Sequence, residues 1–344
     1  MILFPKPLPE YSSLDEKQQY FAQGNQYYPW IVNTADEFDK LYDRLVDEFN
    51  RDFESGTHSL LYRGVNEAKY KTFTSAQRYW LSNDWKDQTL KGFVDYIAGE
   101  LWNIRKNDTL RHFYQSLNVL PNDFLYLTFL QHFGGAAPML DLTHSLDMGL
   151  FFAIDKAKPA TSSGTIDDYI SLQLLDYRNY KLLNIVDLVD MFHSGMENAI
   201  QMVEDIKAKK PGEDFDCSLI ESIDKFTKWH NPQNAGEGLH SIDIGLLDYT
   251  NTTPVVDLKG RRLYWSNIRI IAQKGVMLLY TDTELSLEEY ILKLKAPQLR
   301  CFNIHKSLCD YIAHKLPFGR DKVYPSEEDM AKDANVRALL ARRI

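Results

Sequence analysis

The stretch that decides the fold is Leu130-Gln-His-Phe-Gly-Gly-Ala-Ala-Pro-Met-Leu-Asp-Leu-Thr-His-Ser145. The apolar residues at 124–133 predict a short helix. The glycine pair at 134–135 suits its C-terminal end, because glycine readily adopts the left-handed conformation that ends many helices. An extended segment at 139–143 follows, and the mostly apolar run 146–157 predicts a helix that is buried on most sides.

Polar side chains gather around this predicted strand. Alternate residues of a strand share a face, so Asp141, Thr143 and Ser145 form a polar row if the strand extends that far. Such a row next to apolar residues needs partners or a ligand. Capping is the alternative, since Thr143 or Ser145 could simply start the following helix. His132, at the end of the preceding helix, could likewise be a satisfied structural histidine.

A second motif lies upstream. Thr34 and Glu37 form a capping-box pattern that predicts a helix ending near 54–56. Residues 59–64 then predict a short strand that carries Arg63 at its end. A guanidinium group offers two parallel donors to a phosphate or a carboxylate, so Arg63 is a candidate anion-binding residue. A structural ion pair with a core-edge carboxylate is the competing interpretation.

A third motif lies near the C-terminal end. Residues 267–280 form the strongest strand-rich stretch, in which Arg269, Ile271 and Gln273 would share one face. Gly275 follows on that face and suggests a bulge or a close approach of two backbones. Without the other motifs, the simpler interpretation is that these residues have a structural role.

Together with the remaining patterns, these motifs predict an α+β fold. Strand and helix signals do not alternate regularly, which argues against βαβ winding. Residues 1–30 are rich in Pro, Tyr and Gln and predict an irregular arm. The other expected elements are helices at 87–106, 306–316 and 327–343 and strands at 168–175 and 299–304.

Composition narrows the functional classes. The 344 residues are 44% hydrophobic, which is typical of a globular protein, and 13% aromatic, enough to line a pocket as well as fill a core. A net charge of −9 argues against bulk nucleic-acid binding, which needs clustered cations. No Gly-rich phosphate loop and no zinc-protease or nucleophile-elbow motif is present.

Cysteine and hydropathy patterns address metals and location. The three cysteines are scattered without a Cys-x-x-Cys pair, so we expect no metal site and no disulfide framework. No run of about 18 apolar residues predicts a membrane span. The proline-rich start lacks a basic region and a long apolar region, so it is no signal peptide and a cytoplasmic protein is expected.

The joint order of the three motifs resembles the FRG family, named for its Phe-Arg-Gly motif. Tyr62 stands where that family has phenylalanine. The resemblance is most specific over 59–155, returns at 263–281 and weakly covers the C-terminal helices at 306–343. Family members occur in bacterial and phage-associated settings, which implies a bacterial protein.

The resemblance also implies a domain organisation. Residues 59–344 form the FRG-like domain, and 1–58 form an N-terminal arm and a helix that packs on it. The Lys-rich segment at about 184–232 is expected to be a helical insertion into the domain with a solvated loop.

This chain departs from the family at two positions. Ala137-Pro138 replaces the family's Thr-Arg pair, and Leu142 replaces its tryptophan. If that arginine binds a ligand in the family, either the contact is lost here or Arg78 or Arg269 supplies it.

The same order of residues is more distantly similar to ADP-ribosyltransferases. That similarity implies a mixed or antiparallel sheet core with several packed helices, and NAD as a substrate. It makes Arg63, Thr143 and Gln273 the candidate catalytic residues. Those enzymes carry a glutamate near the last strand, where this chain has Gln273 and Gly275, and an amide cannot act as a base at neutral pH. All candidate NAD-binding residues are Arg63, Gly64, His132, Asp141, Thr143, Ser145, Phe152 and Gln273.

Three functions remain compatible with the sequence. The protein could transfer ADP-ribose from NAD, or cleave NAD. It could instead be a non-catalytic module for a nucleotide or phosphate, or a protein-interaction domain in which the motif residues hold the fold. The expected partners are a nucleotide-like small molecule and, for a transferase, a protein acceptor.

Overall fold

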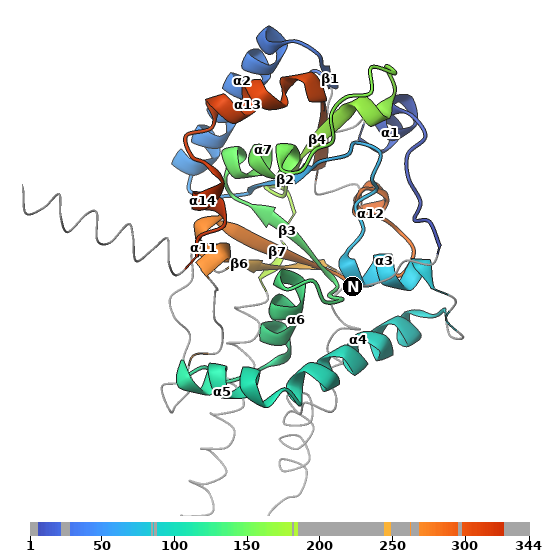
Figure 1. Ribbon diagram of the computed structural model, residues 1–344, viewed down its shortest axis with the longest axis vertical. Helices are drawn as coiled ribbons and strands as arrows, with labels where there is room; N and C mark the ends of the chain where they lie inside the picture. Colours follow the sequence, from blue (N-terminus) through green and yellow to red (C-terminus); the bar gives the residue numbers. More distant parts are fainter. Residues whose placement is uncertain are drawn as a thin grey trace, which may run out of the picture.

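The computed structural model describes the chain over residues 6–21, 28–83, 85, 88–180, 182–184, 244–248, 262, 268–294 and 298–326. Its strands form one sheet in the order β1-β8-β4-β2-β3-β7-β6-β5 (Figure 1). β1 runs parallel to β8 and β5 runs parallel to β6, whereas the other neighbours are antiparallel. The prediction of an α+β fold with a mixed sheet is confirmed.

The strands are short to medium in length. Their bounds are β1 Ile31–Val32, β2 Leu60–Val65, β3 Met139–Thr143, β4 Tyr169–Asp176, β5 Leu183–Asn184, β6 Ile244–Asp248, β7 Gly275–Tyr280 and β8 Gln298–His305. The described helices are α1 Leu14–Phe21, α2 Ala35–Glu54, α3 Ser75–Ser82, α4 Leu90–Arg105, α5 Asp108–Ser116, α6 Asp123–His132, α7 Leu146–Ile154, α11 Ile268–Ala272, α12 Leu287–Leu294, α13 Cys309–Lys315 and α14 Arg320–Val323.

Apolar side chains cover both faces of the sheet. On β2, Leu60 and Tyr62 pack with α2, α7 and α13, whereas Leu61, which points the other way, packs with α1 and α12. On the β3–β7 part of the sheet, Met139 and Met277 pack with α4, α5 and α6. Burial of these side chains on each face is the main force that holds the layers together.

Elements with local sequence signals lie where they were predicted. The Thr34 hydroxyl accepts from the Glu37 amide and completes a capping box at the start of α2. α6, β3 and α7 follow one another as expected, and Gly134 takes a φ of +81° directly after α6. The predicted helical insertion lies almost wholly outside the described residues, as does the predicted helix at 327–343.

Two predictions of local structure are wrong. Residues 268–272 form helix α11, so Arg269, Ile271 and Gln273 do not share a strand face, and the strand begins at Gly275. The reason is tertiary: β3 ends where Thr143 pairs with Gly275, and none of the described strands pairs with the residues before Gly275.

The N-terminal arm is the second correction. It is not wholly irregular, because residues 14–21 form α1. Lys17 of α1 is fully buried and donates to the Ala68 carbonyl at 2.7 Å and the Ser171 hydroxyl at 2.7 Å. These long-range contacts fix the helix, and no pattern within residues 1–30 predicts them.

A backbone contact joins α7 to β2. A Cβ atom at Gly64 would lie 2.1 Å from the Gly149 carbonyl oxygen and 2.2 Å from the Ala153 nitrogen. A Cβ atom at Gly149 would lie 2.8 Å from the Cβ of Tyr62. Both positions therefore exclude a side chain, and α7 lies directly on the strand that carries Arg63.

We expect Gly64→Ala to lower the free energy of unfolding by about 3 kcal/mol or more, because the new methyl group meets backbone atoms that cannot move aside. Gly99→Ala is the matched control. Gly99 lies within α4 with nothing within 4 Å of a built Cβ, so its replacement should stabilise the protein by about 0.5–1 kcal/mol. Urea denaturation measures both. Equal effects of the two substitutions would contradict the backbone contact.

Candidate functional site

A cavity of about 760 Å³ opens beside the point where β2 and β3 separate. The two strands pair only at Tyr62 and Thr143, and β2 continues along β4 as far as Val65. Arg63 and Asp141 therefore lie on diverging strands and both line the cavity. The other walls come from the N-terminal arm, the segment before α3, and the ends of α6, α7 and α11.

Arg63 bridges the gap between the diverging strands. Its Nη1 donates to the Asp141 carbonyl at 2.6 Å, which takes the place of a sheet hydrogen bond. Its Nε is buried and finds no hydrogen-bond partner among the described residues. Desolvation lowers the pKa of Arg63, nearby Arg78 lowers it further and Asp141 opposes both effects, yet part of the side chain stays accessible from the cavity.

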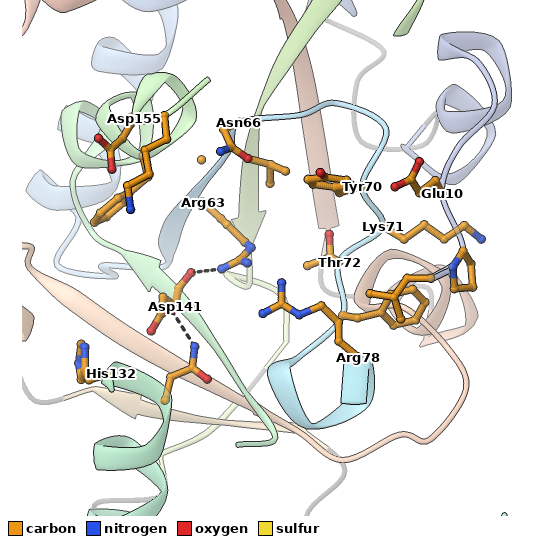
Figure 2. A pocket seen from close by; sticks show the side chains of 18 of the residues that line it. Glu10, Arg63, Asn66, Tyr70, Lys71, Thr72, Arg78, His132, Asp141 and Asp155 are labelled. Atoms are coloured by element: carbon orange, nitrogen blue, oxygen red, sulfur yellow. Dashed lines mark hydrogen bonds between the residues drawn. The ribbon is translucent and has the colours of Figure 1, made fainter. Parts of the chain in front are cut away.

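Arg78, on α3, faces Arg63. Figure 2 shows the two guanidinium groups directed toward the same part of the cavity from different walls. Within the described part of the chain, the Arg78 side chain makes no hydrogen bond and no ion pair, although Asp141 attracts it electrostatically. Neighbouring walls partly desolvate Arg78 and lower its pKa as well, although the residue is exposed at the cavity surface. An arginine has no other state to adopt at neutral pH, so both groups remain charged.

The cavity carboxylates leave these charges largely uncompensated. Asp155 is bound to Arg320 and accepts from the Tyr324 hydroxyl at 3.0 Å. The Asp141 carboxylate accepts from the Gln131 amide at 2.7 Å and is the acidic group beside both arginines. The buried Glu288, which accepts from the Tyr11 hydroxyl, also attracts Arg63. The arrangement can therefore bind an anion, because two cations converge beside Asp141 and neither forms an ion pair with a carboxylate among the described residues.

His132 lies at the end of α6 on the same cavity. Its Nε2 is buried and lacks a hydrogen-bond partner among the described residues. Desolvation lowers the pKa of His132 below its ordinary value, Asp141 raises it and Arg269 lowers it. The imidazole is therefore neutral at pH 7 and can accept or donate a hydrogen bond toward a ligand.

The structure brings most of the candidate residues together, but not all of them. The candidates that line the cavity are Arg63, Gly64, His132, Asp141, Phe152 and Gln273. Thr143 and Ser145 are not among the lining residues. Thr143 is fully buried, donates to the Gln273 carbonyl at 2.7 Å and accepts from the Ser145 amide at 3.0 Å. Ser145 is the N-cap of α7, where its hydroxyl accepts from the Met148 amide.

Gln273 faces the cavity but has a partner within the protein. Its Nε2 donates to the Val323 carbonyl at 3.0 Å. Arg269, one turn earlier, lies on the cavity wall. The third motif thus contributes residues to the cavity wall from helix α11 and the turn that follows it. The sequence had predicted that these residues lie on a strand.

Sequence reasoning missed one wall of the cavity. It is formed by residues 6–10 of the N-terminal arm and by Tyr70, Thr72 and Phe73 between β2 and α3. In the sequence, the clue to this wall was that residues 70–73 follow the Tyr-Arg-Gly motif closely. Its contact with the N-terminal arm depends on the fold.

Comparison with known families agrees with the first two motifs. Residues 58–162 match the family model described as the FRG domain. The protein carries an FRG domain. No curated protein and no solved structure matches the chain. The matched segment contains β2, α3 to α6, β3 and α7, and therefore most of the cavity wall.

None of the helices in the described ranges combines the length and the apolar character needed to cross a bilayer. Within those same ranges, no group of three or more His, Cys, Asp or Glu side chains is arranged to hold a metal ion.

We expect Thr143→Val to lower the free energy of unfolding by about 1–3 kcal/mol, because the Gln273 carbonyl loses its donor and the Ser145 amide loses its acceptor. Thr143→Ser keeps the hydroxyl and should remain closer to wild type. Thermal unfolding compares the three proteins. If valine were tolerated as well as serine, Thr143 would have no structural role.

His132 should also make stability depend on pH. A lowered pKa means that the folded state binds fewer protons than the unfolded state, so stability is lost as pH falls through the ordinary pKa of about 6.5 toward the folded value. His132→Asn removes this contribution. Urea denaturation at pH 7.5 and pH 5 should show a smaller acid-induced loss in the variant, and equal losses would contradict a desolvated, neutral His132.

Proposed function

We propose that the cavity binds the diphosphate of a nucleotide, that NAD is this ligand, and that the protein transfers ADP-ribose from NAD or hydrolyses NAD. The observation that carries the proposal is the pair Arg63 and Arg78, whose guanidinium groups converge without a dedicated carboxylate. Two like charges that face the same cavity repel each other, and an anion bound between them removes that repulsion. A diphosphate supplies that charge and accepts two parallel bonds from each arginine.

The size and walls of the cavity support a ligand of this class. Small-molecule sites commonly enclose roughly 300–1,000 Å³, and the cavity of about 760 Å³ lies within that range. Tyr70, Phe73, Phe152 and Tyr324 contribute aromatic surface to the walls. A charged centre flanked by aromatic walls suits a nucleotide better than inorganic phosphate.

Arg78 supports the likeness to the FRG family despite the departure at Ala137-Pro138. The Ala76 amide of α3 donates to the Ala137 carbonyl at 3.1 Å, and the Ser75 hydroxyl donates to the same oxygen at 3.1 Å. α3 is thereby attached beside the place where the family carries its arginine. We assign to Arg78 the anion contact that Pro138 cannot make.

In the proposed reaction the bond between the ribose C1′ and the nicotinamide nitrogen breaks. Its electron pair leaves with nicotinamide, and the ribose becomes positively charged at C1′. Water or a protein acceptor then adds to C1′ and releases a proton. We assign to the Asp141 carboxylate the stabilisation of this positive charge, since positioning and electrostatics dominate such a reaction.

Binding without chemistry is the second candidate function. It is favoured by Gln273, because this position has an amide rather than a carboxylate and its Nε2 donates to the Val323 carbonyl. Release of nicotinamide from NAD distinguishes the two functions. A protein that binds ADP-ribose but never releases nicotinamide from NAD has the binding function alone.

Arg78→Gln should weaken the binding of ADP-ribose at least about tenfold, because charge-assisted hydrogen bonds to phosphate are lost. Arg111→Gln is the matched control, since Arg111 is half exposed on α5 and is not a cavity residue. Isothermal titration calorimetry measures both affinities. Equal affinity of the Arg78 variant and wild type would contradict the proposed anion site.

A further inference from the structure

The N-terminal arm forms one end of the cavity. Residues 6–10 line it, and Glu10 forms an antiparallel bridge with Tyr70. Figure 2 shows Tyr70 and Glu10 on the opposite side of Arg63 from Asp155. We call the part of the cavity walled by residues 7–10 and Tyr70 the arm lobe.

The arm lobe is held in place from both sides. Next to Glu10, the Tyr11 amide donates to the Lys69 carbonyl at 2.8 Å, and the Tyr11 hydroxyl donates to the Glu288 carboxylate at 2.5 Å. Six residues further on, the buried Lys17 anchors α1 to the Ala68 carbonyl. A wall that is fixed in this way can discriminate between ligands, because no ordering of the arm is needed on binding.

The chemistry of the arm lobe suits a planar ring that bears an amine. Tyr70 is 39% exposed and lines the cavity, and Pro7, Leu8 and Pro9 add apolar surface. A tyrosine ring of this kind is a stacking surface for a nucleobase. The Glu10 carboxylate can only accept hydrogen bonds when it is ionised.

Glu10 also retains acceptor capacity. An ion pair joins it to Lys69 at 3.5 Å, and Lys69 lies closer to Asp167, at 3.1 Å. The Glu10 side chain is 44% exposed, so its oxygens are accessible to a ligand. A carboxylate in this position favours an amine donor and repels a ring carbonyl oxygen.

We infer that the arm lobe binds the base of the nucleotide, and that Tyr70 and Glu10 select an amino-bearing ring of the adenine type. The base stacks on Tyr70 and its exocyclic amine donates to the Glu10 carboxylate. This inference rests on the proposed function, because it requires that Arg63 and Arg78 hold the diphosphate. It places the sugar that carries the leaving group at the other end of the cavity, toward His132 and Asp155.

The test uses three probes on the full chain, namely pyrophosphate, ADP and IDP. IDP differs from ADP in presenting a ring carbonyl and a ring N–H where adenine presents an amine and a ring acceptor. Calorimetry should show that wild type binds ADP about tenfold or more tightly than IDP. Glu10→Gln should bring this ratio toward one, because an amide both donates and accepts. Glu54→Gln, at an exposed end of α2 outside the cavity, is the matched control and should keep the wild-type ratio.

Tyr70→Leu tests the stacking surface separately. It should weaken ADP and IDP binding about tenfold each and leave pyrophosphate binding unchanged. If pyrophosphate binds in an Arg78-dependent manner while ADP and IDP bind equally, or while Tyr70→Leu has no effect, the arm lobe is not a base site and the inference is overturned. If pyrophosphate, ADP and IDP all fail to bind wild type, the proposed function itself fails.

Discussion

The backbone of α7 lies directly on the backbone of β2 at Gly64, and this contact determines where Arg63 points. With α7 seated on one face of the strand, the side chain of Arg63 is directed to the other side of the strand. β2 continues along β4 to Val65, while β3 diverges from β2 after a single pair of residues. The cavity therefore arises from the sheet itself, and the Tyr-Arg-Gly motif supplies a buried ring, a cavity cation and a close backbone contact in successive positions.

Tyr62 shows why the first position of the motif can hold either tyrosine or phenylalanine. Its ring is fully buried, and its hydroxyl finds no hydrogen-bond partner among the described residues. Burial raises the pKa of Tyr62, so the hydroxyl stays neutral. The ring is what the core requires at this position, which agrees with the phenylalanine of the related motif. The glycine and the arginine cannot be exchanged so freely, because one excludes a side chain and the other supplies the charge.

Much of the fold could be predicted because its signals are local. The capping box at Thr34, the glycine turn after α6 and the apolar run of α7 each lie within a few residues of the element they define. Residues 268–274 could not be predicted in the same way. Their isoleucines favour a strand, but β3 ends opposite Gly275 and no described strand pairs with the residues before it. The positions of the neighbouring strands, rather than the strand propensity of the segment, determined its structure.

The residues of the candidate site also fall into two groups, those that the local sequence identified and those that depend on the fold. Arg63, Asp141 and His132 could be found because motif order brought them to notice, and the structure places all three on one cavity. Thr143 and Ser145 were expected beside the ligand because alternate strand residues share a face. The chain turns into α7 directly after Thr143, and both hydroxyls bind backbone amides. Glu10 and Tyr70 carry no local sign of a shared surface, since their bridge spans the N-terminal arm and the segment after β2.

A crystal structure of the protein soaked with ADP-ribose tests the central claim most directly. The account predicts that the diphosphate lies between Arg63 and Arg78, with phosphate oxygens within about 3 Å of both guanidinium groups. Density for the diphosphate elsewhere on the protein, with the space between the two arginines filled by solvent, would contradict the account.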